Sequence, residues 1–433
     1  MPARPIAYNL LRLILAATHT TPRGVDRVDY GYLSYLLDHW PGDVVGVMPT
    51  LMGPRFFRRD QLFKARDRLN ELWHEHIDPG GDRVLARLVQ RFDDPGQPEP
   101  PPKPRDFLPG AKGIPRIAKL VLRGGVSIGK PILDLPPEAL YLDIGHYGLT
   151  FPRAFRWRRK RPDIRTVFMV HDTIPLEYPE FVADETFRAH QRLVVKTSKY
   201  ADSLIVPTRS AGKAVEEALA KHRIRPIDIH PLPLPIDDLF GHHVTPVPEL
   251  QGRPYFMICG AVEPRKNHRL LIEVWRELIR RHGERTPKLI VAGSPGFASQ
   301  EIIREMTAEE SLRRSILLAS GLSSPAIAQL MAGARAVLMP SFIEGFGLPP
   351  GEALSVGTPA LVSDIPAHRE AVGEAGEFLP SKNADPWVEA IERLMDDRHF
   401  DERRRAARAF VPRRWEDYMR AVTAVLLNEP ASA

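Results

Sequence analysis

Two carboxylates eight positions apart occupy a glycine-containing stretch, residues 341–352, that reads SFIEGFGLPPGE. They are Glu344 and Glu352, and Gly345 and Gly347 allow a ligand to approach the backbone closely. A short apolar run before the stretch predicts a strand, and its two prolines suit the first turn of a helix. Because helix N-termini attract anions, the stretch is a candidate phosphate site. The structural alternative is an ordinary strand-to-helix turn with a capping glutamate.

A second candidate site is the stretch GAVEPRKNHR, residues 260–269. Arg265 and Lys266 come just before an expected helix, which Asn267 could cap. Two cations at this end are unfavourable against the helix dipole unless they face a bound anion. We therefore interpret them as contacts to a diphosphate, with exposed, solvated cations as the alternative.

Both stretches follow strands, and ligands of doubly wound sheets collect at the carboxyl ends of strands. Lys266 and Glu352 are therefore expected to converge on one ligand. A carboxylate such as Glu352 suits the hydroxyls of a ribose, and a second, Glu344, suits those of a sugar. Together the residues indicate a sugar nucleotide rather than a bare nucleotide.

The first half offers weaker candidates. His171 and Asp172 end an apolar strand-like run, so His171 could hydrogen-bond a ligand or act as a base. Gly24, in a polar loop before a helix-like segment, could approach a phosphate. Taken alone, His171 is better interpreted as a buried structural histidine.

Other site classes are disfavoured by the sequence. It contains no nucleotide P-loop, no GxGxxG and no His/Cys cluster at metal-ligand spacing. His242 and His243 lie in a proline-rich linker without an acidic or sulfur partner nearby. We therefore predict no metal and no cofactor, with the sugar nucleotide as a substrate.

Composition indicates a globular protein in a reducing compartment. The chain has 433 residues and one cysteine, Cys259, which excludes an intramolecular disulfide. The N-terminal apolar run, residues 6–17, is interrupted by Asn9 and Arg12 and is too short to span a bilayer. We expect a cytoplasmic protein.

The positive charge is concentrated in the first half. Residues 1–240 carry 36 Lys and Arg against 29 Asp and Glu, whereas the whole chain has a net charge of +6. Basic residues cluster in the ranges 112–130 and 153–165. Such clusters suit an anionic membrane surface or a phosphorylated acceptor, although a solvated face is the alternative. Nucleic acid is disfavoured because no binding motif accompanies the charge.

Alternating strand and helix patterns predict two α/β domains with doubly wound sheets. In the second half, the expected strands are residues 255–259, 288–292, 316–319, 336–339, 360–363 and 377–379. The first half has the same alternation, apart from a loosely patterned, proline-rich insertion. The predicted divisions are a first domain 1–236 with an insertion at about 49–137, a linker 237–253, a second domain 254–410 and a final helical segment 411–433.

This combination resembles the retaining glycosyltransferases of the family-4 type, which have the two-domain GT-B fold. The resemblance rests on EPRKN at 263–267, on the E-x7-E pair Glu344 and Glu352, on SDIPAHREAVGEAG at 363–376, on HDTIPLEYPE at 171–180 and on RGVDR around Gly24. It covers most of the second domain and parts of the first. It implies two Rossmann-like domains facing each other across a cleft, with the acceptor on the first domain, the nucleotide sugar on the second, and the last helix crossing back to the first.

The resemblance also implies a role for each candidate residue. The donor-binding roles are diphosphate for Arg265 and Lys266, ribose for Glu352, sugar for Glu344 with the backbone of Phe346, Gly347 and Leu348, and base near Ser320 to Leu322. His171 would line the transfer site, and Gly24 would approach the phosphate or sugar from the first domain. One departure is Ala261, where many members have an arginine.

The expected reaction is transfer of a hexose, with retained configuration, from a nucleotide-diphosphate sugar to a hydroxyl of a glycan or lipid-linked acceptor. Members with EPRKN suggest GDP-mannose as the donor and polysaccharide assembly as the setting. The basic first domain suggests peripheral contact with an anionic membrane. The alternatives are a sugar-nucleotide epimerase of the same fold and a non-catalytic sugar-nucleotide-binding scaffold.

Overall fold

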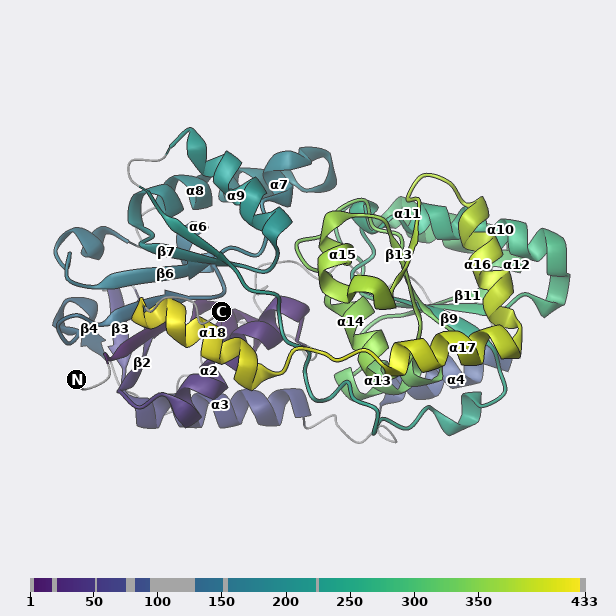
Figure 1. The fold of residues 1–433 in the computed structure, drawn as a ribbon, viewed down its shortest axis with the longest axis horizontal. Coiled ribbons are helices and arrows are strands. Elements are labelled where there is room, and N and C mark those ends of the chain that lie inside the picture. The colour runs from purple at the N-terminus through teal and green to yellow at the C-terminus, as the bar shows by residue number, and fades with distance from the viewer. Residues whose placement is uncertain are drawn as a thin grey trace. The chain divides into compact units, whose positions relative to one another are not determined.

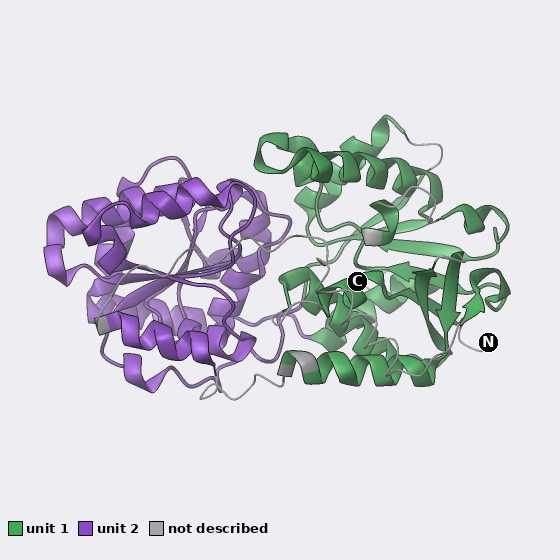
Figure 2. Cartoon of the chain, turned by 180° about the vertical axis from the view of Figure 1, so that it is seen from behind, with its two compact units in different colours: residues 1–75, 106–234, 415–433 green, residues 76–105, 235–414 purple. Residues whose placement is uncertain are grey.

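Two separate sheets organise the chain, each flanked by helices (Figure 1). The computed structural model describes residues 4–17, 22–50, 53–74, 82–93, 129–150, 155–222 and 226–428. Unit 1 comprises residues 1–75, 106–234 and 415–433, and unit 2 comprises residues 76–105 and 235–414 (Figure 2). The prediction of two doubly wound α/β domains is confirmed.

Unit 1 contains an eight-stranded sheet in the order β4-β3-β2-β1-β5-β6-β7-β8. Its strands are β1 (Ile6–Asn9), β2 (Val44–Thr50), β3 (Gly53–Phe57), β4 (Lys130–Pro131), β5 (Leu140–Asp143), β6 (Arg165–Met169), β7 (Ser203–Val206) and β8 (Asp228–Pro231). The strands are parallel except β3 and β4, which add antiparallel strands at one edge. The apolar run at 6–17 is not a single element, because β1 ends at Asn9 and α1 follows.

Helices alternate with the strands of unit 1 along the chain, as in a doubly wound sheet, and one further helix comes from the end of the chain. They are α1 (Leu11–Ala16), α2 (Gly24–His39), α3 (Arg59–His74), α6 (Tyr147–Thr150), α7 (Ile174–Glu177), α8 (Asp184–Tyr200), α9 (Arg209–Ala220) and α18 (Trp415–Leu427). The last of them, α18, packs on α2 although the two are almost four hundred residues apart in sequence (Figure 1). The Tyr32 and Tyr418 hydroxyls share a hydrogen bond of 2.5 Å at this contact.

Gly31 makes the approach of α18 possible. A methyl group at this position of α2 would lie 2.2 Å from the Trp415 ring. We therefore expect Gly31→Ala to destabilise unit 1 by about 1–3 kcal/mol, the usual cost of overpacking, despite the better helix propensity of alanine. Urea unfolding would measure it. The matched control is Gly212→Ala in α9, where the nearest atom, in Val206, is 3.3 Å away; equal stability of the two variants would contradict the prediction.

Unit 2 contains a six-stranded, fully parallel sheet in the order β11-β10-β9-β12-β13-β14. The strands are β9 (Tyr255–Cys259), β10 (Lys288–Ala292), β11 (Ile316–Ala319), β12 (Val337–Met339), β13 (Ala360–Ser363) and β14 (Glu377–Leu379). Strands β9, β10 and β11 follow one another in chain order toward one edge of the sheet. The chain then crosses over, and β12, β13 and β14 follow one another toward the other edge. The order therefore reverses between β9 and β12, where such sheets bind ligands.

Helices cover both faces of this sheet. They are α4 (Arg83–Asp93), α10 (His268–His282), α11 (Ser299–Thr307), α12 (Glu310–Ser315), α13 (Ser324–Gly333), α14 (Leu348–Ser355), α15 (Pro366–Val372), α16 (Asp385–Met395) and α17 (Asp397–Arg408). Trp275 of α10 and Trp387 of α16 belong to the core on one face, and α13 and α14 contribute to the core on the other. The strands are thus mostly covered, as expected for a parallel sheet, except β14 at the edge, where only Leu379 is buried.

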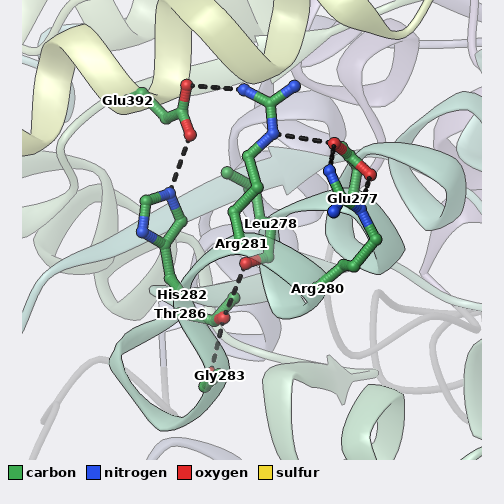
Figure 3. A network of polar contacts seen from close by, with 8 residues as sticks. All are labelled: Glu277, Leu278, Arg280, Arg281, His282, Gly283, Thr286 and Glu392. Carbon is green, nitrogen blue, oxygen red and sulfur yellow. Dashed lines mark hydrogen bonds and ion pairs between the residues drawn. The ribbon is translucent and has the colours of Figure 1, made fainter.

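An ion-pair network joins α10 to α16 at the surface of unit 2 (Figure 3). Glu277 accepts hydrogen bonds from Arg280 and Arg281, and Glu392 accepts from Arg281 and His282 at 3.0 and 2.7 Å. Because these side chains are substantially exposed, we assign the network a small contribution to stability.

The predicted insertion at 49–137 does not belong wholly to the first domain. Helix α4 lies in unit 2 because its apolar residues Leu85, Leu88 and Phe92 complete the core there. Its start is fixed by Asp82, which accepts a 2.8 Å hydrogen bond from the Ser323 amide. The proline-dense part of the insertion lies outside the described residues, whereas β3 belongs to the sheet of unit 1.

Candidate active site

Arg265 and Lys266 lie in a short 3-10 turn, Pro264–Lys266, between β9 and α10. Asn267 follows with a left-handed backbone, at φ 57°, and does not cap α10. Its side-chain amide instead donates to the carbonyls of Pro340 at 3.1 Å and Ser381 at 2.8 Å. The expected capping role was therefore wrong: Asn267 ties the β9 turn to the segment that follows β12.

The same segment brings Glu344 onto both cations. Lys266 Nζ lies 2.5 Å from Glu344 Oε1, and Arg265 Nη1 lies 2.8 Å from Glu344 Oε2. The Ser341 hydroxyl donates a third hydrogen bond to Glu344 at 2.7 Å. Glu344 and Lys266 have side chains only 7% and 8% exposed, whereas Arg265 is 22% exposed and also contacts Glu263. Three charged groups thus meet at the strand-order reversal of unit 2.

Lys266 and Arg265 keep the Glu344 carboxylate ionised. Burial by itself would raise the pKa of Glu344, but attraction to Lys266, and next to Arg265, lowers this pKa far below its usual range. The carboxylate therefore stays ionised at any physiological pH. Glu263 also pairs with Arg265, so two carboxylates balance the two cations in the unliganded structure, and a bound anion would compete with these carboxylates for Arg265 and Lys266.

Helix α14 starts directly beside this cluster. Gly347, with φ 86°, precedes its first residue, Leu348, so the predicted helix start in this stretch is confirmed. Phe346 and Glu352 are buried, with 8% and 2% exposure. The backbone at 346–348 therefore lies at a helix N-terminus, where the dipole favours negative charge.

Residues 320–322, the predicted contact to the base, follow β11, the edge strand beside β10. The Ser320 hydroxyl donates to that of Ser294 at 3.0 Å, and Leu322 is buried. Ser294 belongs to the glycine turn after β10. Three consecutive strand ends, of β9, β10 and β11, thus carry polar turns on the same edge of the sheet.

Sequence reasoning assigned no role to Ser363 and His368, which lie behind Glu344. The Ser363 hydroxyl donates to the Ser341 carbonyl at 2.5 Å, and His368 Nδ1 donates to the Ser363 carbonyl at 2.9 Å. Both residues are fully buried. Their only sequence signal was the stretch SDIPAHRE, in which a histidine follows a proline at a helix start.

His171 and Gly24 belong to unit 1. His171 is 5% exposed, and its Nε2 donates to the Ile144 carbonyl at 2.9 Å. Burial, and secondarily the charge of Arg12, lowers its pKa to about 4, so the imidazole is neutral at pH 7. Gly24 is the first residue of α2, not a loop residue as expected. The helix start is fixed by Asp26, which accepts from the Arg23 amide at 2.9 Å and pairs with Arg12 at 2.7 Å.

Two buried carboxyl groups in unit 1 were not anticipated. Asp143, at the end of β5, accepts a 2.8 Å hydrogen bond from Asn9 at the end of β1, where the strand order of this sheet reverses. Asp29 of α2 is bonded to the Tyr8 hydroxyl. Burial raises the pKa of Asp143 to about 7 and that of Asp29 to about 8.

The raised pKa of Asp143 predicts a pH-dependent stability. An aspartate that titrates near 4 when unfolded and near 7 when folded stabilises the folded state below pH 4, and this contribution is lost as the pH rises toward 7. Asp143→Asn keeps the acceptor oxygen but does not ionise. We expect its melting temperature to match the wild type at pH 4.5 and to exceed it at pH 8.

The control is Asp60→Asn, which alters an exposed carboxylate on α3. Its melting temperature should differ from that of the wild type by the same small amount at both pH values. A constant offset for Asp143→Asn between pH 4.5 and 8 would contradict the raised pKa.

The described residues hold neither a membrane-spanning helix nor a metal-binding cluster. None of the described helices is long and apolar enough to cross a membrane. Nor do the described residues contain a group of three or more His, Cys, Asp or Glu side chains that could hold a metal ion.

Comparison with known proteins gives this arrangement a class. Residues 245–428 match the family described as glycosyl transferases group 1. The match includes all six strands of the unit 2 sheet and helix α18, but not α4. This part of the chain is therefore similar to glycosyl transferases group 1, and the two sheets are those of the GT-B fold.

Individual relatives are distant. The chain is 25% identical over 244 residues to the serotype-specific mannosyltransferase WbdA of Escherichia coli, covering 52% of this chain and 29% of WbdA. It is 25% identical over 229 residues to the O-antigen chain mannosyltransferase RfbU of Salmonella typhimurium, covering 52% and 59%. The chain thus spans less than two thirds of either relative. Among solved structures, sucrose-phosphate synthase from Thermosynechococcus elongatus has a TM-score of 0.60 at 15% identity, covering 98% of each chain, which shows the shared fold.

Proposed function

We propose that this protein is a retaining glycosyltransferase that moves a hexose from a nucleotide-diphosphate sugar to a hydroxyl group. The observation that carries the proposal is the cluster of Glu344, Lys266 and Arg265 at the strand-order reversal of unit 2. Its two cations and the adjacent N-terminus of α14 are suited to a diphosphate. The match to glycosyl transferases group 1 covers these same residues.

Each donor-site residue has a proposed role. Lys266 and Arg265 bind the diphosphate, Glu344 and the backbone of Phe346, Gly347 and Leu348 bind the sugar, Glu352 binds the ribose, and residues 320–322 contact the base. In unit 1, His171 lines the transfer site and Gly24 approaches the phosphate or sugar. The neutral state of His171 suits an acceptor of hydrogen bonds from hydroxyl groups.

In the proposed reaction, the bond between the anomeric carbon and the leaving phosphate oxygen breaks. The acceptor oxygen forms its bond on the same face of the sugar, and the acceptor proton passes to the leaving diphosphate. Lys266, Arg265 and the α14 N-terminus stabilise the charge that develops on the diphosphate. The configuration of the sugar is thereby retained.

The proposed donor is GDP-mannose, and the acceptor is a glycan or lipid-linked hydroxyl in polysaccharide assembly. The mannosyltransferase names of WbdA and RfbU support both proposals. A thermal-shift screen of nucleotide sugars tests the donor. Mass analysis of the products then separates hydrolysis or transfer from epimerisation, and proton NMR of the product reports the anomeric configuration. If the protein bound no nucleotide sugar, both the transferase and the epimerase would be excluded, and a non-catalytic scaffold would be the remaining alternative.

We also propose that unit 1 contacts an anionic membrane. Within the basic range 156–165, fewer residues are available for this contact than the sequence suggested. Among the basic residues at 156–165, Arg158 and Arg161 pair with aspartates, and Arg165 donates to carbonyls at the end of α18. Arg156, Arg159 and Lys160 are exposed. Sedimentation with phosphatidylglycerol vesicles, against neutral phosphatidylcholine vesicles, tests the contact; equal binding to both would contradict it.

A further inference from the structure

His368 is fixed behind the candidate donor site by its Nδ1. This atom donates to the Ser363 carbonyl at 2.9 Å, and the Ser363 hydroxyl donates to the Ser341 carbonyl at 2.5 Å. Ser341 in turn bonds to Glu344. The orientation of the imidazole is thereby coupled to the segment that presents the central carboxylate.

The other ring nitrogen, Nε2, has no hydrogen-bond partner among the described residues, although the side chain is 0% exposed. Because Nδ1 carries the proton, Nε2 of the neutral ring is an acceptor. A buried polar atom without a partner costs about 1–3 kcal/mol, so its retention calls for an explanation.

His368 and Glu344 both border Gly347. A methyl group on Gly347 would be 3.4 Å from His368 Nε2 and 3.8 Å from Glu344 Cγ. The imidazole edge and the carboxylate side chain therefore pack around one glycine α-carbon. An added methyl group would make a tight contact with the imidazole, and the positive φ of 86° favours glycine at this position.

The charges around the imidazole balance one another in the unliganded site. Burial lowers the pKa of His368, Glu344 opposes this effect, and Lys266 adds to it. Arg369 of α15 pairs with Asp364, which lies just before the helix, and both are exposed. Helix α14, which packs against α15, contributes the buried Glu352. Lys266 and Arg265 thus supply the counter-charge of Glu344 when no donor is bound.

We propose that His368 is a positioning residue that takes up a proton when the donor binds. The inference rests on the proposed donor site. When the diphosphate engages Lys266 and Arg265, Glu344 loses part of its counter-charge. Nε2 then forms an N–H bond with a proton from solvent, and the imidazolium supplies the missing charge behind Glu344. The proton returns to solvent when the nucleotide leaves.

Calorimetry with GDP-mannose tests this proposal, because neither phosphate of that ligand titrates near pH 7. Binding heats at pH 7 in buffers of different ionisation enthalpy give the number of protons taken up. For the wild type we expect about 0.3–1 proton, and an affinity that rises by up to about tenfold per unit as the pH falls from 8 to 6. His368→Asn keeps a donor to the Ser363 carbonyl but does not ionise, so it should bind without proton uptake and with a flat pH profile.

Two further variants make the result specific. His282→Asn alters the exposed network at the other end of α10 and should leave the uptake unchanged (Figure 3). His268, buried next to Lys266, is the rival proton acceptor, and burial followed by the charge of Lys266 lowers its pKa to about 3. Undiminished uptake in His368→Asn, or its loss in His268→Asn alone, would overturn the proposal while leaving the donor site intact. Absence of binding by the wild type would instead overturn the proposed donor, and this inference with it.

Discussion

Lys266→Met is expected to lower the rate of sugar transfer by about 10²–10³-fold, because it removes a preorganised charge from the position of the leaving diphosphate. Lys266 is the more buried of the two cations and lies 2.5 Å from Glu344. Methionine retains most of the apolar stem, so the change isolates the charge. Steady-state transfer from GDP-mannose measures the rate, and calorimetry with GDP should show weaker binding.

The same variant is expected to be less stable, since it breaks a buried ion pair, a change that typically costs about 3–5 kcal/mol. Arg265 still faces Glu344 at 2.8 Å and limits the loss. The double variant Lys266→Met with Glu344→Gln removes the unpaired charge and should recover stability without recovering transfer. The control is Arg269→Gln, which breaks an exposed pair on α10. Wild-type activity in Lys266→Met would refute the assignment of the donor site.

Glu344→Gln is expected to separate transfer from nucleotide binding. The carboxylate holds both cations in the unliganded structure, so it competes with a diphosphate for the same two charges. Without it, GDP should bind more tightly by about tenfold, or about 1.4 kcal/mol. Transfer should nevertheless fall by more than about a hundredfold, because the proposed acceptor for the sugar hydroxyls is weakened.

Glutamine at position 344 can still accept hydrogen bonds from Ser341 and Lys266, so the fold should persist. Glu305→Gln, which alters an exposed partner of Arg269, is the matched control and should change neither quantity. Unchanged transfer would exclude a role for Glu344 with the sugar. Weaker GDP binding would exclude the competition between the carboxylate and the diphosphate.

The donor-side cluster was predictable in outline because it depends on local patterns. The strands of unit 2 read as apolar runs, and the glycine and proline positions marked the turns that follow them. Parallel strands place those turns on one edge, so Lys266 and Glu352 could be expected to converge on one ligand. The sequence did not show that Lys266 pairs with Glu344 in the unliganded state, since side-chain pairing depends on distances between residues 78 positions apart.

The assignment of segments to units was less predictable. Helix α4 is amphipathic in sequence, but nothing in its pattern says which core its apolar face joins. The basic stretch at 156–165 is similar: sequence shows charge, and only packing shows that Arg158 and Arg161 are used in ion pairs. The proline-dense stretch and the basic residues at 112–123 lie outside the described ranges, so their predicted roles stay predictions.

The sequence by itself determined the class of fold and the turns that carry the candidate donor site, because strand and helix periodicity and turn composition are local properties of the chain. Only the tertiary structure decided which charges are neutralised and which remain available. It placed Glu344 between two cations, directed Asn267 to the loop after β12, and left the Nε2 of His368 buried beside Gly347. The physical reason is that charge state and hydrogen bonding depend on burial and on neighbours that are distant in sequence.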